Sequence, residues 1–325
     1  MRIAYLFLSL FALIMTDLLQ AQVDSAQVNG FAERVAKENQ LDLSEVLSIL
    51  EKASFQQEII DKMERPAEGT MTWERYKNIF IQPERIAAGV AFWETHAKAL
   101  AEVSASTGVS EEIILGIIGV ETYFGKNKGS YKVLDALYTL GFGYPRRSRF
   151  FSSELEKFLV MAHQEKLDAN EIKGSYAGAM GYGQFMPSSY LAYAKSYEPE
   201  GTADLMNSPE DAIASVANYL KVHRWKSGQP VTTKATFTRQ ISGLRKQQLR
   251  PKNKLRDYTA LGIEPEISVD KDLPATLVTL SSGDQEEHWF GFDNFYVITR
   301  YNHSPMYAMA VYLLAEEIKA QRKQE

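Results

Sequence analysis

One glutamate in the chain has the setting of a catalytic acid. Glu121 follows isoleucines that are spaced four residues apart, and it is the next residue on the same helical face. We expect a carboxyl group on an apolar face to be buried, and burial raises its pKa because the charged form is disfavoured. Such a group can donate a proton near neutral pH. The alternative is a glutamate at a helix end that simply reaches solvent.

A glycine-rich segment at 173–190 is the second candidate for a site. It holds hydroxyl and aromatic side chains among the four glycines Gly174, Gly178, Gly181 and Gly183. Glycine lets a backbone approach a bulky ligand closely, but a close-packed turn between helices explains the same composition equally well. The segment matches neither the Walker pattern nor the dinucleotide pattern, so a phosphate-binding loop is excluded.

Two further stretches suit recognition better than catalysis. Tyr76 lies in an aromatic and charged stretch at 72–80, which either packs a loop or supplies a wall for a sugar ring. Arg146 and Arg147 follow Pro145, whose ring forces the preceding residue into an extended conformation. The two arginines either hold a carboxylate in bidentate fashion or are solvated.

Composition excludes several other chemistries. The chain has 325 residues, a net charge of −5 and no cysteine, so thiol catalysis, disulfides and cysteine metal sites are absent. The acidic balance gives no support to nucleic-acid binding. The five histidines form no His-Glu-x-x-His pair of a zinc hydrolase, and the Gly-x-Ser-x-Gly elbow of a serine hydrolase is missing.

The elements that must position these residues are mainly helical. We expect a helix over 110–125 with Ser110 as N-cap and Gly125 as C-cap, against which another segment packs closely at Gly116 and Gly119. Other helices are expected from Pro83 to just before Gly108, over 149–162, from the Ser208 cap to 225, and over 306–319. The texture at about 229–291 indicates a small sheet inserted between helices. The fold class is therefore α+β and mainly α.

The N-terminus has the features of an export signal. A basic residue and a short apolar run occupy residues 2–15, which fits a signal peptide over 1–21 better than a membrane span. The cleavage site is poor, so an uncleaved anchor is the alternative. No cysteine is present to carry a lipid. We expect a periplasmic protein whose catalytic domain runs over 28–322.

Five motifs together resemble a known family. They are GVET at 119–122, YPRR at 144–147, GSYAGAMGYGQFMPSS at 174–189, SVANY at 215–219 and TRYNHS at 299–304. Their order and spacing, from about residue 72 to residue 317, are similar to those of the B-type lytic murein transglycosylases, glycoside hydrolase family 103. The resemblance implies a lysozyme-like helical core with a small β-subdomain. It also implies cleavage of the β-1,4 bond between N-acetylmuramic acid and N-acetylglucosamine in peptidoglycan, with 1,6-anhydromuramic ends.

The same resemblance assigns roles to individual residues. Glu121 matches the catalytic acid, which then acts as the base for the sugar's own 6-hydroxyl. Ser175 and Asn302 would form hydrogen bonds around the acid and the N-acetyl group. The remaining positions would line the sugar subsites and face substrate carboxylates: Gln184, Tyr219, Tyr301 and Tyr307 at the sugars, Tyr76, Phe185 and Met186 as apolar walls, and Arg146 and Arg147 at the carboxylates.

One departure concerns calcium. Some family members hold the ion in an EF-hand-like loop, and here the corresponding loop at 196–204 contains Pro199 and lacks the leading aspartate. We therefore expect no metal or cofactor, with calcium as a poorly matched alternative. The expected partners are glycan strands and possible cell-wall synthesis or remodelling proteins, bound by a monomer.

Two other functions stay open. A lysozyme-like hydrolase would need a second carboxylate to activate water, and Asp135 is the candidate that the sequence offers. A non-catalytic peptidoglycan-binding protein would have no need of a buried acid.

Overall fold

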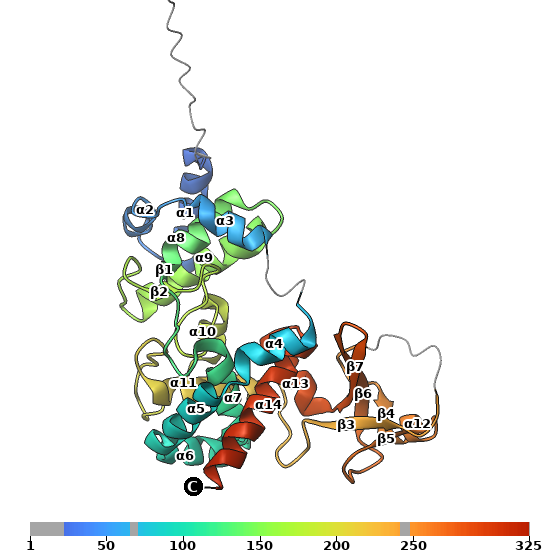
Figure 1. Ribbon diagram of the computed structural model, residues 1–325. Coiled ribbons are helices and arrows are strands. Elements are labelled where there is room, and N and C mark those ends of the chain that lie inside the picture. Colours follow the sequence, from blue (N-terminus) through green and yellow to red (C-terminus); the bar gives the residue numbers. More distant parts are fainter. Residues whose placement is uncertain (1–22, 66–70, 241–247, 325) are drawn as a thin grey trace, which may run out of the picture.

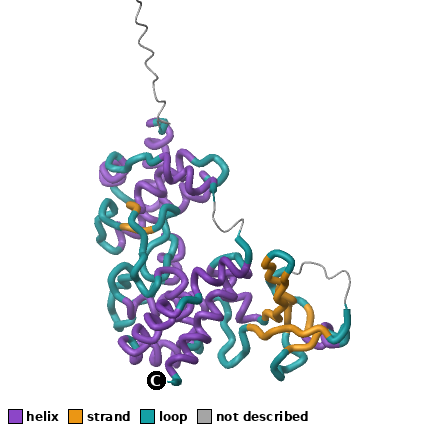
Figure 2. The backbone as a smooth tube through the Cα atoms, viewed as in Figure 1, coloured by secondary structure: helices purple, strands orange, loops and turns teal. Residues whose placement is uncertain are grey.

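Helices dominate the fold, and they gather into two lobes beside a small sheet (Figures 1 and 2). The computed structural model describes residues 23–65, 71–240 and 248–324. The signal peptide expected over 1–21 lies outside them. One lobe holds α1 (Ser25–Asn39), α2 (Leu43–Leu50), α3 (Gln57–Glu64), α8 (Val133–Gly143) and α9 (Ser148–Gln164). The other holds α4 (Trp73–Phe80), α5 (Pro83–Thr95), α6 (Ala97–Thr107), α7 (Glu111–Thr122), α11 (Pro209–Val222), α13 (Asp293–Tyr301) and α14 (Pro305–Arg322).

The segment between the lobes carries the glycine-rich stretch. A two-residue ribbon, β1 (Tyr131–Lys132) with β2 (Lys173–Gly174), leads into it, and α10 (Pro187–Tyr193) follows it. The chain therefore passes from the second lobe to the first after α7 and returns through these glycines, as Figure 1 shows.

Helix α7 lies in the middle of the second lobe. It is buried on nearly every side, and α14 packs directly against it. A Cβ atom on Gly116 would lie 2.5 Å from the carbonyl oxygen of Val311, and one on Gly119 would lie 2.8 Å from Leu314. Close packing at both glycines is thus confirmed, and it brings the start of α14 beside the end of α7.

The inserted sheet is confirmed between α11 and α13. Its antiparallel strands lie in the order β4 (Asn253–Lys254), β6 (Pro274–Ser282), β7 (Gln285–Gly291), β3 (Thr232–Phe237), β5 (Ile263–Pro265), with the short α12 (Leu255–Thr259) beside them. Alternate residues along β6 and β7 pack into two different hydrophobic cores. The cross-strand pair Leu277 and Phe290 packs with α12, whereas Val278 and Trp289 join the main helical core.

Several helix boundaries differ from expectation. The helix expected from Pro83 to Gly108 is broken at His96, which stands between α5 and α6 and forms a hydrogen bond with Glu210 (Nδ1 to Oε1, 2.7 Å). Thr95 and His96 are weak helix formers, which favours a break there. The stretch at 72–80 is helix α4 and not a loop, with the Thr72 hydroxyl accepting from the Arg75 amide at 3.4 Å.

Ser110 is the N-cap residue of α7, as expected, although its side chain makes no capping hydrogen bond. The expected C-cap is wrong, because the helix ends at Thr122 with Tyr123 in the left-handed region, two residues before Gly125. Among the described residues no single helix is long and apolar enough to cross a membrane. Helices α6 and α7 together meet that criterion by length and composition, but they are bent by 115° at the break between them.

Candidate active site

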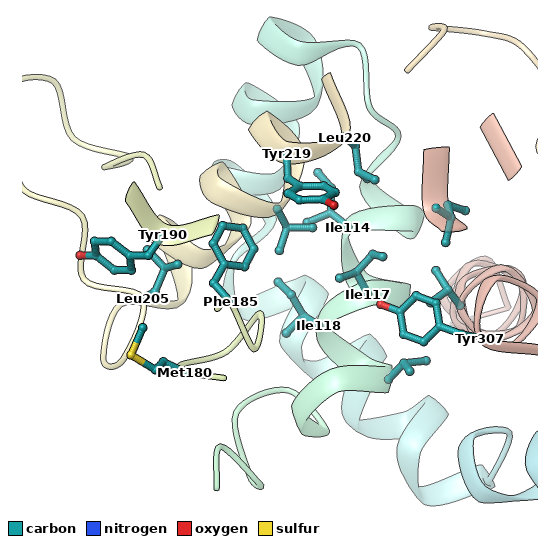
Figure 3. Close-up of a cluster of buried hydrophobic side chains, with 14 of the residues drawn as sticks. Ile114, Ile117, Ile118, Met180, Phe185, Tyr190, Leu205, Tyr219, Leu220 and Tyr307 are labelled. Atoms are coloured by element: carbon teal, nitrogen blue, oxygen red, sulfur yellow. The ribbon is translucent and has the colours of Figure 1, made fainter. Parts of the chain in front are cut away.

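A tyrosine from α14 holds the carboxyl group at the end of α7. The Tyr307 hydroxyl donates a hydrogen bond to Glu121 Oε1 at 2.6 Å. Tyr307 is only 2% exposed, whereas Glu121 is half-buried and keeps contact with solvent. Figure 3 shows the Tyr307 ring beside α14 with its hydroxyl directed at α7, near Ile117. At its C-terminal end the apolar helix thus presents the carboxyl group of Glu121, with a buried donor already aimed at it.

Burial also fixes the protonation state of this donor. Desolvation raises the pKa of Tyr307 well above its ordinary value, and the nearby Glu121 charge and Tyr301 add to the effect. Desolvation and Glu121 raise the pKa of Tyr301 in the same way. Both phenols therefore stay neutral over the range in which a carboxyl group titrates, so Tyr307 remains a donor to Glu121.

Three more aromatic residues of the expected set extend from Tyr307. The Tyr301 ring lies parallel to it with centroids 6.5 Å apart, and the Tyr219 and Phe185 rings lie 4.8 and 5.8 Å from Tyr301. The hydroxyls of Tyr301 and Tyr219 donate to the backbone carbonyls of Gly183 and Arg300, each at 2.5 Å. These two hydroxyls hold the backbone in place, and Phe185 is 2% exposed.

The glycine-rich segment is a close-packed turn. A Cβ on Gly174 or Gly181 would lie 2.2 Å from a backbone oxygen of the protein, and one on Gly183 would lie 2.8 Å from the Tyr301 hydroxyl. Gly178 and Gly181 also have positive φ angles of 85° and 69°. Of the two readings left open by the sequence, packing against the protein itself accounts for these glycines.

Ser175 and Gln184 shape the same turn. The Ser175 hydroxyl oxygen accepts from the amides of Ala177 (3.3 Å) and Ala179 (3.0 Å). Gln184 has a positive φ of 49°, and its amide donates to the carbonyls of Lys128 and Gly181 at 3.1 and 2.9 Å. Both side chains are half-buried. Gln184 thereby joins the turn to the segment that follows α7.

The other expected wall residues lie on separate elements. Tyr76 of α4 is 2% exposed and close enough to Tyr307 to raise its pKa. Met186 is half-buried and precedes α10. Asn302 is half-buried between α13 and α14, and its backbone carbonyl accepts from the Ser304 amide at 2.7 Å. Tyr76 thus belongs to the surroundings of Tyr307.

The two arginines lie in the other lobe. Arg146 and Arg147 are exposed at the turn between α8 and α9, and the Arg147 guanidinium lies 4.4 Å from the centroid of Phe150. No ion pair of either arginine exists among the described residues. The structure therefore does not bring them to Glu121 through any contact.

The buried carboxylates of the described chain serve the fold. Asp135 of α8 accepts from the Ser54 amide (2.9 Å) and from Gln56 Nε2 (2.8 Å). Glu154 accepts from the amide and hydroxyl of Ser188 at the start of α10. Each of these carboxylates uses both oxygens on neighbouring elements, so neither resembles the setting of Glu121.

Comparison with known proteins decides the family. Residues 24–316 match the family model described as "Transglycosylase SLT domain". The chain belongs to this family. It is 41% identical over 303 residues to the membrane-bound lytic murein transglycosylase B of Escherichia coli, covering 90% of this chain and 83% of the relative. These findings confirm the resemblance stated from the motifs and the expectation of a lytic transglycosylase enzyme.

Two solved family members confirm the fold class. The lytic transglycosylase SltB1 of Pseudomonas aeruginosa has a TM-score of 0.87 and 42% identity, with 92% of this chain and 99% of that chain covered. SltB3 of the same organism, solved in complex with NAG-anhNAM-pentapeptide, has a TM-score of 0.80 and 28% identity, with 90% and 79% covered. The fold is therefore that of the lytic transglycosylases, a lysozyme-like helical core with a small sheet.

The loop at 196–204, compared with an EF-hand in the sequence, is closed by hydrogen bonds to Asp211. Slt35 of E. coli, 41% identical, has been solved in complex with calcium. In this chain the Asp211 carboxylate accepts from the amides of Tyr197 and Asp204, both at 2.8 Å, and so closes the loop from within. The described residues contain no group of three or more His, Cys, Asp or Glu side chains that could hold a metal ion.

Sequence reasoning missed the residues that fix the end of α7. The Thr122 hydroxyl donates to the carbonyl of Tyr182 at 2.8 Å and ties α7 to the glycine-rich turn. Arg85 of α5 donates to the carbonyl of Gly119 at 3.2 Å, and its guanidinium lies 4.7 Å from the centroid of Tyr123. Tyr123 and Phe124 have positive φ angles of 53° and 57°. The available signal was Thr122 itself, a hydroxyl directly after the candidate acid.

Proposed function

We propose that this protein cleaves the β-1,4 bond between N-acetylmuramic acid and N-acetylglucosamine in peptidoglycan and leaves 1,6-anhydromuramic ends. The observation that carries the proposal is the pairing of Glu121 with the buried Tyr307 hydroxyl at 2.6 Å, at the end of a rigid apolar helix. A family member solved with NAG-anhNAM-pentapeptide supports the substrate class and the type of product.

The proposed reaction uses one carboxyl group twice. Protonated Glu121 gives its proton to the glycosidic oxygen, the C1–O4 bond breaks, and the N-acetylglucosamine part leaves with a free 4-hydroxyl. The carboxylate then removes the proton from the 6-hydroxyl of the muramic sugar while that oxygen attacks C1. Glu121 ends protonated, as it began, and no water is consumed. The attack is intramolecular, so a high effective concentration replaces an activated nucleophile.

Tyr307 would assist the second half of this cycle. A phenol that donates to Glu121 stabilises the carboxylate formed after the first proton transfer, because a hydrogen bond to an ionised group is stronger than one to a neutral group. Since Tyr307 itself stays protonated, it supplies this bond throughout the cycle. It would act by positioning Glu121 and by stabilising its carboxylate form.

The runner-up is a hydrolase that gives reducing ends. Ordinary glycosidases use two carboxylates that flank the bond. Asp135, the second carboxylate that the sequence offers, has both oxygens engaged by Ser54 and Gln56 in the other lobe. This engagement favours the single-carboxylate reaction over hydrolysis. The placement of Tyr307 on Glu121 likewise favours an enzyme over a binding scaffold.

The remaining roles belong to the same proposal. Ser175 and Asn302 would bind around the acid and the N-acetyl group, the aromatic and glutamine side chains would line the sugar subsites, and Arg146 and Arg147 would meet substrate carboxylates. The protein would act as a monomer in the periplasm, where its substrate lies, after export by residues 1–21. Glycan strands are the proposed partners, and cell-wall synthesis or remodelling proteins are further candidates.

The test is mass spectrometry of muropeptides released from purified peptidoglycan by the wild type beside Glu121→Gln. The amide keeps the shape of the side chain but cannot donate and reclaim a proton. We expect anhydro products from the wild type and a loss of about a hundredfold or more in the variant, the range for removal of a general acid. Hydrated reducing ends from the wild type would favour the hydrolase, and no release from either protein would favour the binding scaffold.

A further inference from the structure

A lysine at the end of α3 is held against a tyrosine beside the glycine-rich turn. The Lys62 ammonium donates a hydrogen bond to the Tyr131 hydroxyl and lies 4.6 Å from the centroid of the same ring. Both contacts fix a side chain that would otherwise sample many rotamers. Lys62 is exposed, and an ammonium has three donors, so two remain for a ligand.

Tyr131 places this cation next to residues of the candidate site. It is the first residue of β1 and pairs with Gly174, the residue before Ser175. Tyr176, which follows Ser175, is close enough to act electrostatically on Lys62. The carbonyl of Lys128, three residues before Tyr131, accepts from Gln184 at the far end of the same turn. Lys62 therefore borders the glycine-rich turn from the side of the first lobe.

The groups that face Lys62 leave its positive charge largely available to a ligand. Hydrogen bonding to Tyr131 is the main cause that raises its pKa, and Glu58 on the same helix and Tyr176 contribute as well. Glu58 makes no ion pair with it within 4 Å among the described residues. The exposed Lys132 and Lys173 stand opposite each other at the next pair of the ribbon, which projects to the other face, and Lys132 acts electrostatically on Asp168.

We propose that Lys62, held by Tyr131, binds a carboxylate of the peptide stem that projects from the glycan strand. This inference rests on the proposed function and adds a specificity-determining residue to it. Peptide stems carry free carboxylates, and an ammonium fixed on an aromatic ring pairs with one at little further cost in side-chain entropy.

The experiment compares two substrates and two lysines. Turnover of Lys62→Met and wild type is measured on peptide-bearing strands and on strands stripped of peptide by an amidase. Lys37→Met is the matched control, because Lys37 is also exposed in the last turn of a helix of the same lobe and makes no ion pair within the described part of the chain. Tyr131→Phe removes only the hydroxyl that holds the ammonium.

We expect Lys62→Met to raise KM about fivefold on peptide-bearing strands at low salt, the range of an exposed charge pair. On stripped strands its KM and kcat should equal those of the wild type, and added salt should shrink the difference. The KM of Tyr131→Phe on peptide-bearing strands should lie between those of the wild type and Lys62→Met. The KM of Lys37→Met should match that of the wild type on both substrates. A loss of equal size on both substrates, or no loss, would overturn the inference. Wild-type protein that releases no anhydro product from either substrate would instead overturn the proposed function.

Discussion

Two acidic residues in helices of opposite lobes show how the fold separates the proposed catalytic carboxyl group from a structural one. Asp135 in α8 is 5% exposed and accepts hydrogen bonds from a backbone amide and a side-chain amide of the neighbouring loop. Glu121 in α7 is half-buried and is held by the phenol of Tyr307, which belongs to a helix far along the chain. Only Glu121 combines a fixed orientation with access to solvent.

The difference lies in what each carboxyl group is used for in the folded state. The hydrogen bonds that Asp135 accepts join α8 to the loop before α3, so its carboxyl group is part of the fold. Glu121 sits at the end of an element whose packing comes from Ile, Val and Gly contacts with α14 and does not depend on the carboxyl group. A proton can therefore enter and leave Glu121 while α7 stays in place.

Tyr307→Phe is the substitution for which we expect the largest change in activity. It removes the hydroxyl donor and keeps the buried ring, so the fold should remain. A hydrogen bond to a charged group is worth about 1.5–3 kcal/mol, which predicts a fall in kcat of about ten- to a hundredfold with little change in KM. Steady-state kinetics on peptidoglycan check it. Tyr219→Phe, which loses a hydroxyl bonded to the carbonyl of Arg300, should lose less, and an equal loss in both would contradict the special role of Tyr307.

Asp135→Ala should lower the stability of the fold and leave the catalytic rate nearly unchanged. The change leaves the Ser54 amide and the Gln56 side chain without their acceptor, which predicts a loss of about 1–3 kcal/mol in the free energy of unfolding. Urea unfolding of the variant measures it. Kinetics at a temperature where the variant is fully folded should give a kcat close to that of the wild type. A catalytic defect without a stability defect would mean that Asp135 takes part in the chemistry after all.

The smallest effect is expected at His223, which stacks on Tyr219 at the edge of the aromatic group around Tyr301. Burial lowers the pKa of His223, so the folded protein binds the proton less readily than the unfolded chain. The stability contributed by the neutral ring is therefore present above the ordinary pKa of histidine and is lost as the pH falls below it. We expect the Tm of His223→Gln to fall less than the Tm of the wild type when the pH is lowered from about 7.5 to about 5.5. Parallel shifts in both proteins would count against this.

Local rules predicted the elements that depend on local signals. Ser208 and Pro209 start α11 as expected, with the Ser208 hydroxyl accepting from the Asp211 amide at 3.1 Å. The small sheet expected at about 229–291 is formed by the strands from β3 to β7. Apart from the weak helix propensity of Thr95 and His96, the break at His96 had no local signal, because the apolar pattern continues across it and the hydrogen bond between His96 and Glu210 depends on the tertiary fold. The same is true of the left-handed residues after α7, which Thr122, Arg85 and their partners hold in place.

The candidate site was predictable only in part for the same reason. Glu121 was found from the spacing of apolar residues, and the close packing at Gly116 and Gly119 from two glycines inside a helix. The partner of Glu121 is 186 residues away, so only the family motifs could point to Tyr307, and they did not indicate a bond to the acid. That the glycines serve packing and not the approach of a ligand could be recognised only from the positions of Leu205 and Ala179 in the folded protein.

The most direct test of the claim that one carboxyl group completes the reaction is digestion of peptidoglycan in water enriched in heavy oxygen, followed by mass spectrometry of the muramic ends. If Glu121 directs the sugar's own 6-hydroxyl to C1, the ends will be lighter than hydrolytic ends by one water and will carry no heavy oxygen. Ends that contain heavy oxygen at C1 would mean that water is the nucleophile, and they would contradict the account.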